Sequence, residues 1–265
     1  MDVRERHVLL TGASGGIGAA LAARLADAGA RLTLVARESV ALKQVAVDTG
    51  GFARPTDLLN LEDLPALIAE AEAVNGPVDV LINNAGVEVA GYLPRQRADE
   101  VATVLGLNLH APIELCRQLL QPMVARGRGH IMNVSSFAGV ATFPGLAVYG
   151  ASKAGLSQFT AGLRADLRGL PIGTTLVELG PVLTPMLQRA KSYPPTGQSF
   201  DRLRRWHLLN NLTADEVADV MARALGADRS HVRLPRRGAV APRITELPRA
   251  TVSLLLTGIA HRDGR

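Results

Sequence analysis

A glycine-rich turn near the start of the chain, between an apolar run and a helical stretch, limits the possible folds most strongly. The apolar run His7–Thr11 leads into Gly-Ala-Ser-Gly-Gly-Ile-Gly, and Ile17–Ala28 has the pattern of a helix that ends at Gly29. Glycines let the backbone turn sharply, and the free N–H groups at a helix start can bind a pyrophosphate. The segment therefore predicts a dinucleotide-binding turn, although a tight turn that binds nothing uses the same glycines.

The rest of the chain continues this alternation of strands and helices. A helix is expected at Leu61–Val74, and the capping-box sequence Thr213–Glu216 starts another. The alternation predicts an α/β fold of Rossmann type, a doubly wound parallel sheet with helices on both faces. A mixed α+β fold is the alternative. Arg31–Ala36 is expected to be a strand. The nearly continuous apolar run Val78–Asn84 is expected to be a strand buried on both faces, and Ile131–Ser135 and Thr174–Leu179 repeat its pattern.

The length of the chain fits one domain over residues 1–265, which is long enough to bury a full core. After Leu183 prolines and arginines become frequent, and residues 186–212 are expected to form a long irregular segment that acts as a substrate lid. Residues 231–265 are expected to form a C-terminal extension with a helix at Ile244–Ala260.

Cysteine use and hydropathy argue against secreted and membrane-spanning classes. Cys116 is the one cysteine and cannot form an internal disulfide, and Met1–Arg6 lacks the apolar run of a secretory signal. The apolar segment Thr251–Ala260 has ten residues, whereas a membrane-spanning helix needs roughly 20. We therefore predict a cytoplasmic protein without a transmembrane segment, for which peripheral membrane contact stays open.

The charge is unevenly distributed, with a net charge of −2 in residues 1–188 and +7 in residues 189–265. A basic end of this kind can attract nucleic acid, an anionic membrane or an acidic ligand. However, we find no nucleic-acid-reading motif, and aromatic residues make up only 3% of the chain, which leaves few groups for base stacking. A solvated arginine-rich surface is the simpler interpretation, and no nucleic-acid partner is expected.

The end of the second expected strand bears on the choice between NAD and NADP. An acidic side chain there would bind the ribose hydroxyls of NAD and repel a 2′-phosphate. In this chain the position is Ala36, followed by Arg37, whose guanidinium can hold a phosphate in bidentate fashion. This favours NADP, although Glu38 could neutralise Arg37 at the surface.

A tyrosine and a lysine four residues apart, Tyr149 and Lys153, lie on one face of an expected helix. Ser136 follows the expected strand Ile131–Ser135, and Asn108 lies in an earlier helical segment. Together with the glycine-rich turn and Asn-Asn-Ala-Gly at Asn83–Gly86, this set resembles the short-chain dehydrogenase/reductase family. The resemblance covers about residues 7–185 and the capped helix near 213–226. Several motifs in one order are far more specific than a glycine-rich turn alone.

The resemblance implies a role for each catalytic residue. Tyr149 would be the general acid/base, and Ser136 would hold the reacting oxygen of the substrate. Lys153 would bind the nicotinamide ribose and lower the pKa of Tyr149, while Asn108 would support a proton path behind Lys153. The resemblance also implies a set of cofactor-binding residues, Gly12, Ser14, Gly16, Ile17, Gly18, Asp57, Leu58, Asn84, Ala85, Gly86, Val182 and Thr184, together with Tyr149 and Lys153.

A simple electrostatic argument limits what Lys153 can do. Tyrosine titrates near 10, so a base that acts near pH 7 needs stabilisation of about 4 kcal/mol. One cation about 5 Å away supplies roughly 3 kcal/mol at an effective dielectric constant of about 20. Lys153 alone therefore falls short, whereas in the reduction direction Tyr149 needs only to keep its proton and donate it.

The expected function is an NAD(P)-dependent oxidoreductase that interconverts a secondary alcohol and a ketone, prefers NADP(H) and takes a hydrophobic substrate under the lid. The alternative is a non-catalytic dinucleotide-binding regulatory protein of the same fold. The resemblance also implies a homo-oligomer, a dimer or tetramer formed through the helices that carry Asn108 and Tyr149. No metal site is expected, because the six histidines lack paired ligand spacing and Cys116 has the context of a buried apolar residue.

Overall fold

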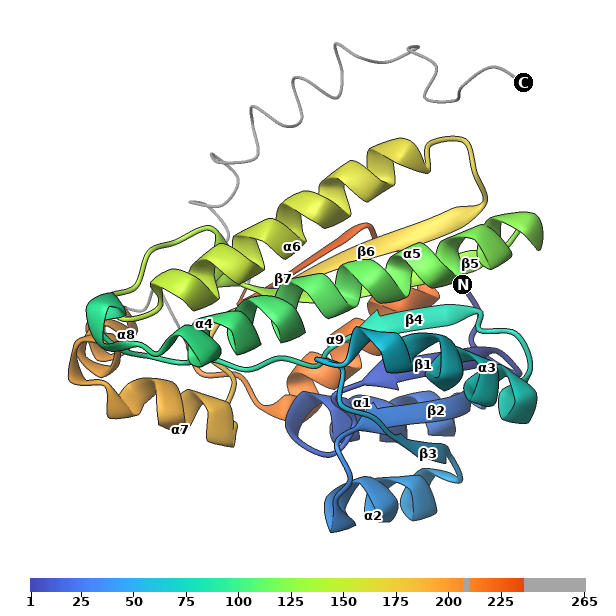
Figure 1. Ribbon diagram of the computed structural model, residues 1–265, viewed down its shortest axis with the longest axis horizontal. Helices are drawn as coiled ribbons and strands as arrows, with labels where there is room; N and C mark the ends of the chain where they lie inside the picture. The colour runs from blue at the N-terminus through green and yellow to red at the C-terminus, as the bar shows by residue number, and fades with distance from the viewer. Residues whose placement is uncertain (207–209, 236–265) are drawn as a thin grey trace.

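The computed structural model of the chain describes residues 1–206 and 210–235. Its centre is a seven-stranded sheet in the order β3-β2-β1-β4-β5-β6-β7, in which every neighbouring pair is parallel (Figure 1). The strands are β1 (His7–Thr11), β2 (Arg31–Ala36), β3 (Phe52–Pro55), β4 (Val80–Asn83), β5 (Gly129–Ser136), β6 (Ile172–Leu179) and β7 (His231–Leu234). The predicted doubly wound parallel sheet is confirmed.

Helices cover both faces of the sheet. On one face lie α1 (Gly16–Asp27), α2 (Val40–Thr49) and α9 (Ala214–Gly226), and on the other lie α3 (Leu64–Asn75), α4 (Ala98–Leu105), α5 (Ala111–Ala125) and α6 (Ala147–Asp166) (Figure 1). Each face has its own apolar cluster of buried side chains. In β1, for example, Val8 and Leu10 belong to the first cluster and Leu9 to the second. This explains why the strands are almost continuously apolar.

The strand order reverses between β1 and β4, the neighbours at the centre of the sheet. In an open α/β sheet such a reversal leaves a crevice beyond the carboxyl ends of the strands, where ligands bind. The predicted start of α9 is confirmed, because the Thr213 hydroxyl accepts a hydrogen bond from the Glu216 N–H and the Glu216 carboxylate accepts one from the Thr213 N–H.

The region expected to be an irregular lid is helical instead. It forms α7 (Pro185–Ser192) and α8 (Pro194–Arg205), separated at Tyr193. The prolines that argued against regular structure lie in the first turn of each helix, where a missing N–H breaks no helical hydrogen bond. An isolated parallel β-bridge between Val182 and Leu212 joins the chain just before α7 to the chain after α8.

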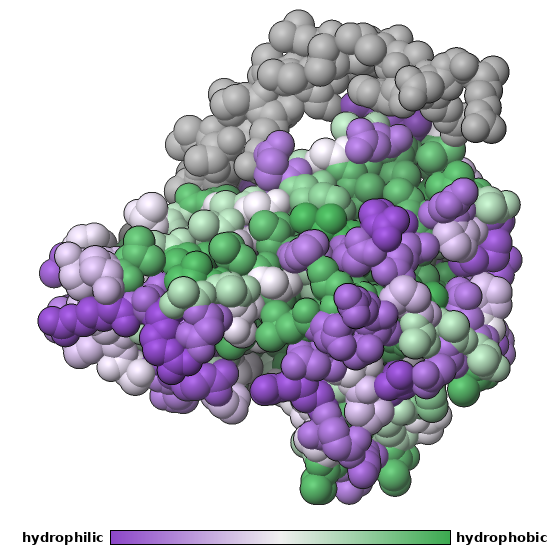
Figure 2. Space-filling view, viewed as in Figure 1, coloured by the Kyte–Doolittle hydropathy of each residue, from purple (hydrophilic) through white to green (hydrophobic). Residues whose placement is uncertain are grey.

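The first residues of the expected C-terminal extension belong to the sheet. His231–Leu234 is β7, which pairs with β6 at the edge of the sheet. The expected helix at Ile244–Ala260 lies outside the described residues. Among the helices that the structure describes, none combines the length and apolar character needed to cross a bilayer. In the space-filling view of Figure 2, apolar residues gather over the face formed by α5 and α6.

Candidate active site

The glycine-rich turn between β1 and α1 is packed against the segment that follows β4. Gly12 has a φ of +68°, and a Cβ there would lie 2.8 Å from the Cα of Ala85. A Cβ at Gly18 would lie 2.0 Å from the carbonyl oxygen of Gly12. The amide of Asn84 donates to the carbonyls of Thr11 and Gly12, at 3.0 and 3.2 Å. Glycine is therefore required by close backbone approach at two positions of this turn.

The start of α1 fits the pyrophosphate of a dinucleotide. Gly15, at the N-cap, has no side chain with which to cap the helix, and the first turn consists of Gly, Ile, Gly and Ala. The first N–H groups of the helix and the positive end of its dipole are thus left for an anionic ligand. Gly16 has a φ of +54° and is exposed, so the backbone is open to close approach.

Three residues expected to contact the adenosine half lie further along the same edge of the sheet. Arg37 is exposed directly after β2. Asp57 is exposed shortly after β3, whereas the side chain of Leu58 is buried in the apolar core. These positions agree with the carboxyl-end crevice, but the three residues do not line the central cavity described below.

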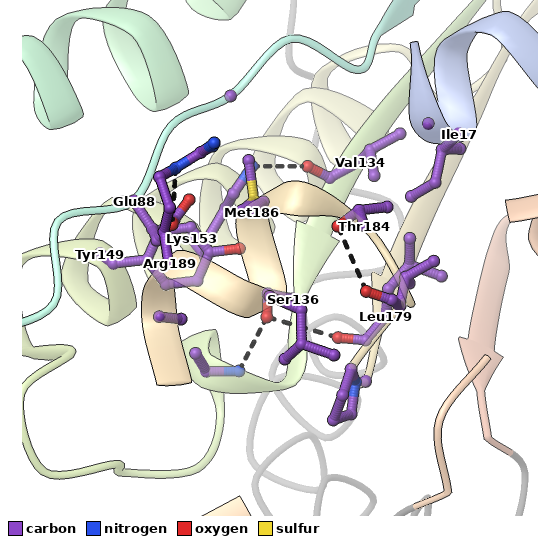
Figure 3. Close-up of a pocket in the computed structure, with 18 of the residues that line it drawn as sticks. Ile17, Glu88, Val134, Ser136, Tyr149, Lys153, Leu179, Thr184, Met186 and Arg189 are labelled. Carbon is purple, nitrogen blue, oxygen red and sulfur yellow. Dashed lines mark hydrogen bonds and ion pairs between the residues drawn. The ribbon is translucent and has the colours of Figure 1, made fainter. Parts of the chain in front are cut away.

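Ser136, Tyr149 and Lys153 converge on a cavity of about 420 Å³ (Figure 3). Ser136 ends β5, and its hydroxyl donates to the Leu179 carbonyl at 3.3 Å and accepts from the Ala138 N–H at 3.1 Å. Tyr149 lies in the first turn of α6, and Lys153 follows one turn later. The Lys153 ammonium donates to the Val134 carbonyl at 3.0 Å and lies 5.9 Å from the centroid of the Tyr149 ring.

Burial controls the pKa values of this pair. It raises the pKa of Tyr149 to about 12; a hydrogen bond with Ser136 acts in the opposite direction, and the Glu88 carboxylate adds to the rise. Burial also lowers the pKa of Lys153 to about 8. The Lys153 ammonium is directed to the Val134 carbonyl, and burial, which opposes both charged forms, is the largest cause of both shifts. A phenol of this kind keeps its proton at neutral pH.

Asn108 lies behind the cavity wall. It belongs to a π-helical turn, Gly106–His110, between α4 and α5, and such widened turns are common at functional sites. Its buried amide accepts from the Val87 N–H and donates to the Val87 carbonyl, both at 2.8 Å, and donates to the Ser152 hydroxyl at 3.1 Å. A Cβ at Gly86 would lie 3.2 Å from the Asn108 amide oxygen and 3.4 Å from the Lys153 ammonium. Asn108 thus fixes the loop after β4 next to Lys153.

Most of the predicted site residues surround this one cavity. Those that line it are Gly12, Ser14, Gly16, Ile17, Asn84, Ala85, Gly86, Ser136, Tyr149, Lys153, Val182 and Thr184. Gly18 does not line the cavity but packs against the Gly12 carbonyl of the turn. Asn108 does not line it either but holds the loop after β4 through the Val87 backbone.

The far side of the cavity is apolar. The apolar residues of the expected lid that line the cavity are Met186, Leu187, Ala190 and Phe200, whereas Trp206 of the same segment is 64% exposed. Residues 207–209 of the expected lid lie outside the described residues. The sequence interpretation missed Phe143, whose ring lies 5.0 Å from that of Phe200. α7 and α8 thus contribute apolar surface to the cavity that Tyr149 also lines.

The sequence interpretation also missed a pair of charged residues in the cavity wall. Glu88, in the loop after β4, is buried, and Arg189 of α7 lies beside it (Figure 3). The available signal was an acidic residue between Val87 and Val89, two positions after the Asn-Asn-Ala-Gly motif. Apolar flanks of this kind favour burial, and a buried acid is most often functional or paired.

Metal-ligand side chains do not gather within residues 1–206 and 210–235, where no group of three or more His, Cys, Asp or Glu could hold a metal ion. Cys116 is buried in α5 as expected. Burial raises the pKa of its thiol to about 12, which leaves it unreactive at neutral pH.

The sequence and the structure both have known relatives. Residues 6–194 match the family model for short chain dehydrogenase. The chain is 40% identical over 177 residues to the ketoacyl reductase HetN of Nostoc sp., a match covering 65% of this chain and 62% of that protein, less than two thirds of its length. It is 34% identical over 249 residues to a fatty acyl-CoA reductase of Mycobacterium tuberculosis, covering 91% of this chain and 80% of that protein.

Solved structures give the same result. A metagenomic short-chain oxidoreductase in complex with NADP superposes with a TM-score of 0.72 at 31% identity, covering 88% of this chain and 98% of that one. A short-chain dehydrogenase/reductase from Burkholderia phymatum in complex with NAD has a TM-score of 0.80 at 24% identity, covers 100% of this chain and 99% of that one, and supports the fold. The chain therefore belongs to the short-chain dehydrogenase family of NAD(P)-dependent oxidoreductases.

Proposed function

We propose that this chain catalyses the NADP(H)-dependent interconversion of a secondary alcohol and a ketone, with a hydrophobic substrate. The observation that carries the proposal is the convergence of Ser136, Tyr149 and Lys153 on one cavity that continues to the glycine-rich turn. A dinucleotide held by the turn would extend towards the tyrosine, and a substrate would lie between it and the apolar wall.

The state of Tyr149 suits the reduction direction. With a pKa of about 12, its hydroxyl is protonated at neutral pH and can donate to the oxygen of a carbonyl substrate. Ser136 would hydrogen-bond the same oxygen, and the Lys153 ammonium would bind the ribose. Asn108 would keep the loop beside Lys153 in place. The bound nicotinamide would supply the hydride or accept it.

The NADP preference rests on Arg37 and its neighbours. Glu38, which could have neutralised Arg37, instead forms an ion pair with Lys43 at 2.7 Å. Arg37 is exposed at the end of β2, and the structure shows no ion pair for it among the described residues. Its guanidinium is therefore available to a 2′-phosphate on the ribose.

The apolar wall supports a hydrophobic substrate. Aromatic and aliphatic side chains from the β5–α6 connection and from α7 and α8 face the catalytic residues. An acyl chain fits such a wall, and two relatives are named as a ketoacyl reductase and a fatty acyl-CoA reductase. α7 and α8 would act as the lid over this substrate. A homo-oligomer and a cytoplasmic location stay predictions.

The test is Tyr149→Phe, which removes one hydroxyl and keeps the ring. We expect kcat for NADPH-dependent reduction of medium-chain methyl ketones to fall by about 10²–10⁴-fold, while the Kd for NADPH changes by less than about threefold. Near-normal turnover by the variant would contradict the proposal. Absence of turnover by the parent protein with every ketone and alcohol tested, despite NADPH binding, would favour the non-catalytic alternative.

A further inference from the structure

Glu88 is a buried acid with unused hydrogen-bonding capacity in the cavity wall. Its side chain is 3% exposed, and neither carboxylate oxygen has a hydrogen-bond partner among the described residues. Burial raises the pKa of its carboxyl group to about 7, against the opposing effect of Arg189. Its charge also contributes to the high pKa of Tyr149, and both residues line the same cavity.

Arg189 makes only a weak, solvent-exposed contact with Glu88. The Nε of Arg189 lies 3.4 Å from Oε1 of Glu88, and the Arg189 side chain is 61% exposed. This contact joins α7 to the loop after β4, as the dashed line in Figure 3 shows. The contact is long for a charge-assisted hydrogen bond, and it leaves Oε2 without any partner in the described chain.

A buried carboxylate without hydrogen bonds is costly, and buried polar groups in native proteins are normally hydrogen-bonded, so Glu88 requires a partner. Apolar side chains, Phe137, Leu146 and Met186 among them, line the same cavity. An incoming anion would be repelled by Glu88. A second cation is not needed, because Arg189 already lies beside the carboxylate. A neutral donor completes the site without adding a charge.

We propose that Glu88 is a specificity-determining residue whose carboxylate accepts a hydrogen bond from a hydroxyl group of the substrate, separate from the oxygen that reacts at Tyr149. The substrate class is then a hydrophobic ketone, or the corresponding alcohol, that carries a second hydroxyl group. This inference rests on the proposed function and adds a polar contact to a cavity that otherwise selects apolar substrates.

The experiment compares nonan-2-one with its hydroxy derivatives, in which the hydroxyl group is placed at each position along the chain. The ratio of kcat/KM between the best hydroxy ketone and nonan-2-one is measured with NADPH at pH 8, where a carboxyl group with a pKa of about 7 is about nine tenths ionised. It is determined for the parent protein, Glu88→Leu and Glu88→Gln. We expect the parent ratio to be about tenfold or more, because a hydrogen bond to a buried charged group contributes that much discrimination. The ratio should fall to about one in Glu88→Leu and to an intermediate value in Glu88→Gln.

Glu70→Leu is the matched control, because Glu70 lies on α3 in an ion pair with Arg54 and does not line the cavity. It should keep the parent ratio. The Kd for NADPH of each variant reports whether the fold and the nucleotide site are intact, and the isosteric Glu88→Gln tests the idea if Glu88→Leu does not fold.

The outcomes separate this inference from the proposed function. Reduction of nonan-2-one with the same ratio in the parent protein and both Glu88 variants would overturn the role of Glu88 and leave the proposed function in place. NADPH binding without turnover of any ketone would overturn both. A stronger preference for an amino ketone than for every hydroxy ketone would overturn the choice of a hydroxyl group.

Discussion

Gly18→Ala is predicted to distort the glycine-rich turn by a single methyl group. The new Cβ would lie 2.0 Å from the Gly12 carbonyl oxygen, where contacts under 3.0 Å are essentially never seen. The carbonyl must therefore move by about 1 Å, and its 3.2 Å hydrogen bond from Asn84 is lost with it. Overpacking of this kind costs about 1–3 kcal/mol. The lost hydrogen bond, about 1 kcal/mol, roughly offsets the helix propensity gained by alanine.

The expected net destabilisation of Gly18→Ala is therefore about 1–3 kcal/mol, which lowers Tm by about 2–12 °C for a domain of this size. The Kd for NADPH should rise by about tenfold or more, equivalent to about 1.4 kcal/mol, because the N–H groups of the turn lose their alignment. Differential scanning fluorimetry and a fluorescence titration with NADPH measure the two effects.

Gly15→Ala is the matched control in the same turn. Gly15 has an extended backbone with a φ of 173°, and a Cβ there would meet no described atom within 4 Å. Its Tm should change by less than about 2 °C. If Gly18→Ala matched Gly15→Ala in both Tm and NADPH affinity, the argument from close backbone approach would be refuted.

Three further predictions concern charge and capping. Lys153 has a pKa of about 8, so its side chain is charged below that pH and about nine tenths neutral one pH unit above it. The value of kcat/KM for NADPH reports the ionisation of the free protein, and it should therefore fall as the pH rises through 8. A flat profile from pH 7 to 10 would contradict this. Arg37→Ala should raise the Kd for NADPH by about tenfold and leave that for NADH within about twofold, since only the 2′-phosphate contact is removed; equal losses for both nucleotides would remove the case for NADP preference. Thr213→Ala should lower the free energy of unfolding by about 0.5–2 kcal/mol in urea titrations, because α9 loses its N-cap, and an unchanged midpoint would show that the cap contributes nothing.

The high pKa of Tyr149 has a consequence for the direction of the reaction. Deprotonating a phenol with a pKa of about 12 near neutral pH is unfavourable, whereas donating its proton to a developing alkoxide is not. Burial and the Glu88 carboxylate both raise the pKa of Tyr149 and so disfavour its phenolate form. In the proposed reaction, this state of Tyr149 suits proton donation to a ketone.

Local patterns in the sequence were enough for the framework of the fold. The bounds expected for β1 and β2 agree with the structure, and the capping box at the start of α9 is present. The shorter strands β3 and β7 and the helices α7 and α8 were not predicted. β3 and β7 have four residues each, and each is held by pairing with the strand that precedes it in the chain, β2 or β6. The prolines of α7 and α8 obscured a helical pattern that they allow in a first turn.

The sequence by itself determined the parallel α/β sheet, the glycine-rich turn and the set of Ser136, Tyr149 and Lys153, because periodicity, backbone freedom and motif spacing are properties of neighbouring residues. Only the tertiary structure decided how the charges of the site behave. Glu88 and Arg189 are far apart in the chain and meet at 3.4 Å only once α7 packs over the loop after β4. The pKa values of Tyr149 and Lys153 likewise follow from burial, which depends on how the whole chain surrounds each group.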